Sequence, residues 1–283
     1  MSGSASIRLG EPAYPPLLAQ IYDPPRRLYL RGARSDLLHG PCAAIVGARS
    51  CSAYGAQVAR ALGRELARAG GVVVSGLARG VDAEAHRGAL EAGGATVAVL
   101  GCGIDRDYPR AHAELARRIA EAGLVVSEYP PGTEPAPWRF PARNRIIAGL
   151  SLAVVVVEAR ERSGALITAD FALEEGREVL AVPGEITSAL SAGTNALLRL
   201  GAAPLLTADD ALTVLGLERE PAEPPRVEGA AGAVLALLRE SPAAVDELVR
   251  RSGLGAEQVA AALVELELDG LACAGDGVYR PSA

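Results

Sequence analysis

The sequence predicts an α/β protein: a Rossmann-like, doubly wound, mostly parallel sheet followed by a small C-terminal winged-helix domain. Three observations support this. Short runs rich in Val and Ala recur between stretches with helical periodicity, most of these runs lead into Gly, Ser or Arg, and after residue 216 the runs give way to short helices. Continuous apolar strands separated by helices are typical of a parallel sheet covered by helices on both faces.

The elements can be assigned in chain order. Residues 1–40 are rich in proline and predict an extended lead-in with at most one small helix. Seven strands are expected after it, at 42–46, 72–75, 96–100, 124–127, 152–159, 178–183 and 204–206. Helices are expected at 54–69, before the stop signal Gly70-Gly71, and at 82–92 and 110–122. The Rossmann-like domain should therefore occupy residues 41–216.

The C-terminal part has a different pattern. Residues 217–229 are rich in Pro and Glu and predict a linker, and residues 230–283 predict a winged-helix-like domain. Its expected elements are helices at 230–239, 243–251 and 256–269, followed by a hairpin. The last helix carries four acidic residues and no arginine. Because acidic side chains repel a phosphate backbone, we expect this module to pack, dimerise or bind a protein rather than read duplex DNA.

Composition excludes several function classes. All 28 basic residues are arginine, so a Walker A loop or a Schiff-base enzyme lacks its lysine. The three histidines form no HExxH pair, and the four cysteines lack metal-ligand spacing, which favours free thiols and predicts no metal site. No apolar run approaches the roughly 18 residues of a membrane span, and the N-terminus lacks the features of a signal peptide. We expect a cytoplasmic protein without a membrane span.

The charge distribution leaves nucleic-acid binding open. Residues 1–215 hold 22 arginines and 22 acidic residues, whereas residues 216–283 hold 6 and 12, so the net charge of −6 belongs to the C-terminal part. An acidic protein can still bind nucleic acid where its arginines converge. In a chain with 4% aromatic residues, the stretch 138–147 places Trp138 and Phe140 beside three arginines. Rings that stack on bases and guanidinium groups that grip phosphates suit a single-stranded polynucleotide. The alternative is a helix start with solvated arginines.

Loops rich in Gly, Ser and Arg follow five of the predicted strands. Ligands of parallel sheets bind at the carboxyl ends of the strands, and a helix that starts there offers N–H groups to an anion. The residues concerned are Gly47, Arg49, Ser50, Ser52, Ser75, Gly76, Gly101, Ser163 and Gly164. One such loop can be explained as a helix cap, whereas five on one edge predict a phosphate-binding rim. Asp82 and His86, four residues apart, predict a helix cap and a surface imidazole.

Several strings, in this order, resemble the DNA-processing protein DprA (Smf) family. They are VGARS with YG (46–50, 54–55), SGLARGVD with AH (75–82, 85–86), SEYPPG (127–132), FPARNRIIAGLS (140–151), SGALITA (163–169) and VPG (182–184). Together they cover residues 11–215 almost continuously. The resemblance implies a non-catalytic, cofactor-free protein that binds single-stranded DNA, protects incoming strands during natural transformation and loads the RecA recombinase onto them as a homodimer.

The resemblance also implies site residues. Arg49, Phe140, Arg143 and Arg145 would contact DNA, and Gly47, Ser50, Ser75, Gly76, Ser163 and Gly164 would shape the pocket; Ser52, Gly101 and Asn144 complete the predicted set. Two departures from the family qualify the match. Many members carry an N-terminal helical domain, which the 40-residue lead-in is too short to hold, and only some relatives have a winged helix.

Two alternatives stay open. The first is a Rossmann-like nucleotide or nucleoside-monophosphate hydrolase, whose related family has a PGGxGTxxE motif. Here Pro183-Gly184 and Gly193-Thr194-Asn195 are separated by eight residues, the catalytic Glu is missing, and Glu185 is wrongly placed. The second is an NAD-binding oxidoreductase, but Arg49 stands where the GxGxxG fingerprint needs glycine.

Overall fold

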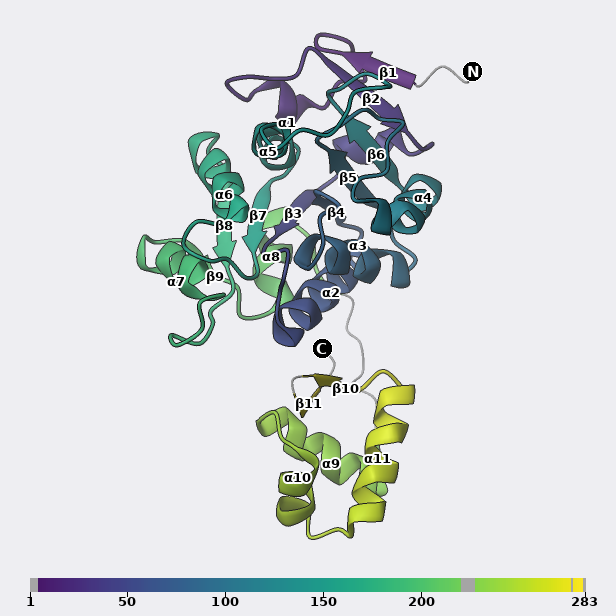
Figure 1. The fold of residues 1–283 in the computed structure, drawn as a ribbon, viewed down its shortest axis with the longest axis vertical. Coiled ribbons are helices and arrows are strands. Elements are labelled where there is room, and N and C mark those ends of the chain that lie inside the picture. Colours follow the sequence, from purple (N-terminus) through teal and green to yellow (C-terminus); the bar gives the residue numbers. More distant parts are fainter. Residues whose placement is uncertain (1–4, 220–226, 276, 282–283) are drawn as a thin grey trace. The chain divides into compact units, whose positions relative to one another are not determined.

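The computed structural model describes residues 5–219, 227–275 and 277–281. It divides into two compact units, Met1–Glu220 and Pro221–Ala283 (Figure 1). Most of the linker predicted at 217–229 lies outside the described residues, since the description stops at 219 and resumes at 227.

The first unit is built on a nine-stranded sheet with the order β1-β2-β6-β5-β4-β3-β7-β8-β9. Its strands are β1 (Ala5–Arg8), β2 (Arg27–Arg31), β3 (Cys42–Val46), β4 (Val72–Ser75), β5 (Thr96–Leu100), β6 (Leu124–Ser127), β7 (Ala153–Val156), β8 (Glu178–Ala181) and β9 (Ala203–Pro204). From β6 to β9 every neighbouring pair is parallel. The chain winds from β3 to one side as far as β6 and then, from β7, to the other. The strand order therefore reverses between β3 and β7, the switch point where such sheets bind ligands.

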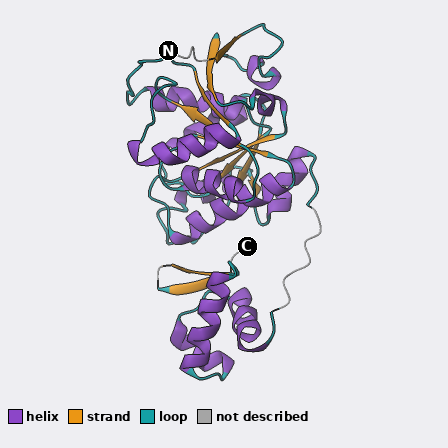
Figure 2. Ribbon diagram, turned by 90° about the vertical axis from the view of Figure 1, so that its right-hand side faces the viewer, coloured by secondary structure: helices purple, strands orange, loops and turns teal. Residues whose placement is uncertain are grey.

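Helices cover both faces of the sheet, as the sequence predicts (Figure 2). Residues of α2, α3, α4 and α8 join the clusters on one face, and residues of α1, α5, α6 and α7 join the cluster on the other. Their bounds are α1 (Pro16–Ala19), α2 (Ala53–Arg68), α3 (Val81–Glu91), α4 (Ala113–Ala122), α5 (Arg139–Gly149), α6 (Gly164–Glu174), α7 (Ala192–Arg199) and α8 (Ala208–Leu215), with 3₁₀ turns at Ser35–His39 and Arg110–His112.

Buried strands and close helix packing hold the unit together. In β3 successive side chains alternate between faces, so that Ala43 and Ile45 pack under α2 while Ala44 and Val46 face the opposite layer. Both faces are apolar because both are covered. Helices α2 and α3 approach each other at Gly63, where a Cβ atom would collide with the carbonyl oxygen of Ala85. Glycine at this position is therefore required by the close approach.

The structure corrects the prediction of an extended lead-in. Strand β2 pairs antiparallel with β6, with Tyr29 opposite Ser127, and β1 pairs antiparallel with β2. Leu28 and Leu30 are buried in the core. The alternation of polar and apolar residues in Arg27–Arg31 is the period of a strand with one buried face. The prolines that precede this segment, Pro24 and Pro25, hid that signal.

His86 is also placed differently from the prediction. Its imidazole is fully buried instead of lying at the surface, and its Nδ1 lies 2.8 Å from the hydroxyl of Thr96. Because that hydroxyl donates to the carbonyl of Val73, it accepts a hydrogen bond from the ring, which places the ring proton on Nδ1. Burial, followed by the positive groups of His112 and Arg143, lowers the pKa of His86 to about 3.

Acid should therefore destabilise the protein through His86. The ring is neutral when folded and takes up a proton at its ordinary pKa when unfolded, so its contribution is present above that pKa and is lost as pH falls towards 3. Between pH 7 and pH 5 we expect the free energy of unfolding to fall by about 2 kcal/mol from this group alone. Urea unfolding of wild type and His86→Gln at both pH values checks this. An equal fall in both proteins would contradict the assignment.

The second unit is a winged helix, as predicted. Helices α9 (Gly229–Glu240), α10 (Val245–Ser252) and α11 (Ala256–Leu268) precede an antiparallel hairpin of β10 (Ala272–Gly275) and β11 (Val278–Pro281). The unit has its own apolar core, which includes Leu238, Leu248 and Leu263.

The described residues contain neither a membrane-spanning helix nor a metal-binding cluster. No helix there has both the length and the hydropathy to cross a membrane. The same residues contain no cluster of three or more His, Cys, Asp or Glu side chains that could bind a metal ion. Cys42, Cys51 and Cys102 are free thiols.

Candidate nucleic-acid interface

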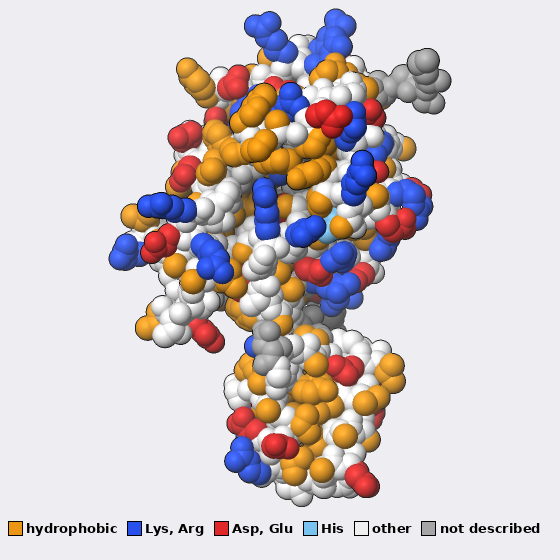
Figure 3. All heavy atoms as spheres, in the orientation of Figure 1, with side chains coloured by type: hydrophobic (Ala, Val, Ile, Leu, Met, Phe, Trp, Pro, Cys, Tyr) orange, Lys and Arg blue, Asp and Glu red, His pale blue; other side chains and the backbone are white. Residues whose placement is uncertain are grey.

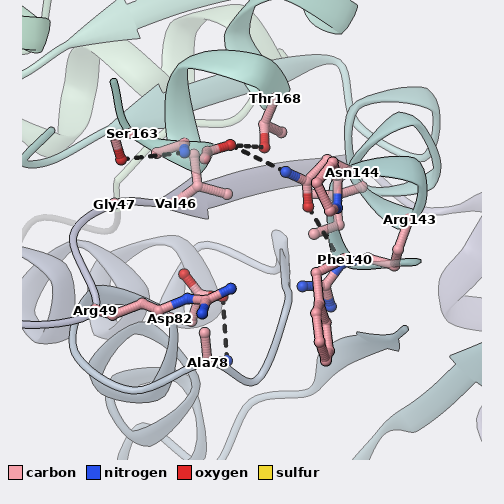
Figure 4. Close-up of a pocket in the computed structure, with 14 residues that line it drawn as sticks. Val46, Gly47, Arg49, Ala78, Asp82, Phe140, Arg143, Asn144, Ser163 and Thr168 are labelled. Atoms are coloured by element: carbon pink, nitrogen blue, oxygen red, sulfur yellow. Dashed lines mark hydrogen bonds between the residues drawn. The ribbon is translucent and has the colours of Figure 1, made fainter. Parts of the chain in front are cut away.

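A pocket opens at the switch point, at the carboxyl ends of β3 and β7 (Figure 4). Its volume is about 200 Å³. The residues that line it are Val46, Gly47, Arg49, Ala78, Asp82, Phe140, Pro141, Arg143, Asn144, Ile147, Ser163, Gly164, Ala165 and Thr168. Segments from four parts of the sequence therefore meet here, and two of the predicted arginines, Arg49 and Arg143, lie in the same pocket.

The loop after β3 brings Arg49 into the pocket. A Cβ atom on Gly47 would lie 2.7 Å from Val81 and 3.0 Å from the carbonyl oxygen of Glu158, so only glycine lets the chain pass between these neighbours. Arg49 is exposed, and its guanidinium lies 5.8 Å from the centre of the Phe140 ring, within cation–π range. Among the described residues it makes no ion pair, although its charge acts on the buried Asp82, so the exposed guanidinium is available to a ligand.

Phe140 belongs to an aromatic pair that continues the pocket. Its ring stacks on Tyr108, with centroids 5.2 Å apart and planes 24° apart. Gly101 makes room for it, because a Cβ atom there would lie 2.8 Å from the Phe140 ring. A second hollow of about 270 Å³ adjoins the first, and its lining adds Ser50, Arg79 and Tyr108 to residues of the central pocket.

Tyr108 and Arg79 were missed by the sequence analysis. Arg79 lies in the loop after β4, and Tyr108 lies beyond the loop after β5, where both strands present their carboxyl ends. The rule that ligands bind at these ends applies to both residues. If the sequence analysis had applied this rule to every residue that follows a strand, it would have included Arg79 and Tyr108.

The Arg143 side chain is buried beneath the pocket and holds neighbouring backbone segments together. It donates hydrogen bonds to the backbone carbonyls of Gly76, at 2.8 Å, and Val99, and to the side chain of Asn144. Burial lowers the pKa of Arg143 to about 10, against the opposing attraction of Asp82. Gly76 has no side chain because a Cβ atom would collide with this guanidinium. Arg143 thus ties α5 to the ends of β4 and β5 and makes the floor of the pocket positive.

Asp82 is the only carboxylate among the residues that line the central pocket. It accepts hydrogen bonds from the backbone N–H groups of Gly76, at 3.1 Å, and Ala78, at 3.2 Å. Both N–H groups belong to the loop before α3, and the N-cap residue of that helix is Gly80, which makes no side-chain cap; Asp82 therefore does not cap α3 as the sequence predicted. Burial raises the pKa of Asp82, while Arg143 and the two N–H groups act in the opposite direction.

The start of α6 forms the opposite wall. Ser163 is the N-cap, since its hydroxyl accepts a hydrogen bond from the N–H of Ala165 at 3.3 Å. Asn144 donates to the carbonyl of Gly164 at 3.0 Å and so fastens α5 to this turn. A Cβ atom on Gly164 would meet no atom within 4 Å, which leaves space above the helix N-terminus. The arrangement suits an anion.

Three predicted residues do not face the pocket. Ser52 caps α2 and donates to Glu158 at 2.5 Å, and Ser75 is fully buried with its hydroxyl on the carbonyl of Ile45. Arg145 pairs with Glu128 at 2.7 Å and Asp23 at 3.0 Å, outside the residues that line the pocket. Two residues of helix rotate a side chain by about 200°, so Arg145 points away from the side occupied by Arg143.

Arginines without an acidic partner gather at the carboxyl edge of the sheet. Many arginines elsewhere on this unit pair with acids, as Arg60 does with Glu91 and Arg117 with Glu114. In the part of the chain that the structure describes, five arginines in the loops at this edge make no ion pair: Arg49, Arg79, Arg110, Arg160 and Arg162. Several blue groups surround the hollowed centre of this face in Figure 3. A negatively charged ligand would find its uncompensated cations here.

The fold and the pocket define a Rossmann-type protein with a basic and aromatic site at its switch point and a separate winged helix. The sequence model of the DNA recombination-mediator protein A family matches residues 5–216, and that of the DprA winged helix domain matches residues 218–277. The chain therefore belongs to the DNA recombination-mediator protein A (DprA) family.

Individual relatives agree with this assignment. The DNA processing protein DprA of Streptococcus pneumoniae is 46% identical over 207 residues, which are 73% of this chain and 73% of that protein. The X-ray structure of DprA from the same organism superposes with a TM-score of 0.72 at 44% identity and covers 78% of this chain and 76% of that chain. DNA processing protein A from Helicobacter pylori, whose structure concerns its single-stranded DNA binding mode, has a TM-score of 0.68 at 33% identity, over 75% and 97% of the two chains.

Proposed function

We propose that this protein binds single-stranded DNA along the carboxyl edge of its sheet and loads the RecA recombinase onto it, without catalysing a reaction itself. The observation that carries the proposal is the placement of Arg49, which makes no ion pair with the described residues, beside the stacked rings of Phe140 and Tyr108. In this proposal the protein acts in the cytoplasm as a homodimer, and the incoming strands of natural transformation are its substrate. Membership of the DprA family supports these further roles.

The chemistry of the pocket favours a single strand over a duplex. A ring can stack only on a base whose face is not covered by its neighbour, and a single strand can turn its bases away from the stack. The phosphates would then contact Arg49 and the start of α6 at Ser163. Contacts to phosphates do not depend on the base sequence. We expect binding that depends little on base sequence.

The hydrolase alternative lacks a catalytic group in the right place. Asp82 already accepts two backbone hydrogen bonds through its Oδ2. The Gly184 and Asn195 segments bond to each other at 3.0 and 3.2 Å, but neither they nor the exposed Glu185 line the pocket. A base-release assay on nucleoside monophosphates tests this alternative, and clear turnover would favour it.

A binding comparison across salt tests the proposal. We expect a single-stranded oligonucleotide to bind more tightly than its duplex, with a log–log salt slope of about −0.7 for each phosphate that is neutralised. A RecA filament assay on the same strand then tests loading. Equal affinity for duplex and single strand would contradict the site, whereas single-strand binding without an effect on RecA would contradict the loading role only.

The winged helix should contribute nothing to duplex binding. Helix α11 exposes Val264 (55%) and Leu268 (83%) beside Glu257 and Glu265, so its outer face is apolar and acidic. The visible face of this unit shows mostly orange and red side chains (Figure 3). Deleting residues 217–283 should leave affinity for single strands within about twofold, and the isolated unit should not shift a duplex, because acidic groups repel phosphates. Duplex binding by the isolated unit at physiological salt would prove this wrong.

A further inference from the structure

A second groove lies beside the central pocket. Its volume is about 420 Å³, and it lies between the turn after β7 and the loop after β8. Its lining consists of Arg160, Glu161, Arg162, Ile186, Thr187, Ser188, Ala189 and Ala192. The predicted set of DNA contacts includes none of these residues.

The groove is continuous in the chain with the pocket. The N–H of Ser163 donates to the carbonyl of Arg160 at 3.1 Å, which closes a turn over residues 160–163. Ser163 then caps α6 and lines the central pocket, across from Arg49 and Phe140 in Figure 4. One turn therefore presents Arg160 and Arg162 to the groove and Ser163 to the pocket.

Backbone hydrogen bonds hold the two sides of the groove together. The N–H of Ala159 donates to Leu190, and the N–H of Gly193 donates to Ala159, both at 2.7 Å. A Cβ atom on Gly193 would lie 2.7 Å from the Ala159 carbonyl, so the two segments touch. The backbone segments on the two sides of the groove are therefore held against each other.

The side chains of the groove match a sugar–phosphate strand. Arg160 and Arg162 are exposed and, among the described residues, have no acidic partner, while Thr187 and Ser188 supply hydroxyl groups. Glu161 is the single acid of the lining. Ile186 is 95% exposed at the rim, where its aliphatic side chain can cover the face of a base or a deoxyribose.

We propose that a single strand held at Phe140 continues over the start of α6 into this groove, where Arg160 and Arg162 bind its phosphates. This inference rests on the proposed function. It predicts a site with two parts: an aromatic pocket that short oligonucleotides fill, and a basic extension that only longer ones reach. The extension adds affinity in proportion to length and leaves base preference unchanged.

The test compares two lengths of oligo(dT), about 6 and about 20 nucleotides, a range typical of single-strand sites. In the double variant Arg160→Ser/Arg162→Ser, we expect the salt slope for the longer oligomer to become shallower by about 1.4, since two phosphate contacts are lost. Binding of the shorter oligomer should stay at the wild-type level. The matched control is Arg8→Ser/Arg118→Ser, which removes the same charge from arginines that line neither the central pocket nor the groove. It should change neither slope.

Several outcomes would overturn the inference. An unchanged slope for the longer oligomer would do so, and so would an equal loss for both lengths. A third contradicting outcome is that the double variant loses binding together with dissociation of a dimer, measured by light scattering. The groove would then be a contact between protein copies. If the wild type binds neither oligomer, the proposed function itself fails. Ile186→Asp provides a second variant, for which we expect the same dependence on length.

Discussion

Arg49→Ala is expected to weaken binding of single-stranded DNA by about 10- to 100-fold, the range for a lost hydrogen bond between a charged donor and a phosphate. The exposed guanidinium makes no ion pair among the described residues, so it need not break one to bind a phosphate. The loss should be similar for different sequences, since phosphate contacts do not specify bases. Fluorescence anisotropy with several unrelated oligonucleotides measures it.

The control for this prediction is Arg118→Ala. Arg118 is exposed on α4, has no ion pair in the described chain, and lies outside both hollows. Its replacement removes the same net charge and should change affinity by less than about threefold, because exposed charges beyond a Debye length are screened. Equal effects of the two substitutions would mean that binding follows net charge and not the pocket.

Arg143→Met should act mainly on folding. The guanidinium is buried and donates to the carbonyls of Gly76 and Val99, which would lose a partner, and Asp82 would lose the positive charge that acts on it most strongly. We expect the free energy of unfolding to fall by about 3 kcal/mol. DNA affinity should fall as well, because the loop after β4 shapes the pocket. Urea denaturation with a parallel binding assay measures both.

Arg143→Lys keeps the positive charge but not the hydrogen-bonding geometry, so it separates the charge of this residue from its bridging of two carbonyls. A lysine has no planar fork to bridge two carbonyls, so stability should remain below wild type. If Arg143→Met unfolds at the wild-type urea concentration, the buried guanidinium does not hold the strand ends together. The structural account of this residue would then be wrong.

The sequence predicts the sheet well because each central strand is covered on both sides. Strands such as β3, β4, β5 and β6 appear as unbroken apolar runs with the bounds that the structure gives them. The first two strands were missed because β2 alternates polar and apolar residues and follows a proline-rich segment. Such a strand lacks the unbroken apolar run of a strand that is covered on both faces.

The sequence predicts which loops meet at the site, but not which of their side chains point into it. The glycines, Arg49, Phe140 and Ser163 lie at the pocket because loops at strand ends converge there whatever their detailed shape. The sequence could not separate Arg143, buried under Gly76, from Arg145, which pairs with Glu128, although helical rotation distinguishes them once α5 is known. The stacking of Tyr108 on Phe140 joins residues 32 positions apart, which no local pattern reveals.

Photo-cross-linking tests the central claim most directly. A single-stranded oligonucleotide that contains bromodeoxyuridine is bound to the full chain and irradiated, and the attached peptide is identified by mass spectrometry. We expect base cross-links at Phe140, which lines both the central pocket and the adjoining hollow, or at Tyr108, which lines the adjoining hollow, and loss of these cross-links in Phe140→Leu/Tyr108→Leu. Cross-links that all fall outside this pair, for example within residues 227–281, would contradict binding at the carboxyl edge of the sheet.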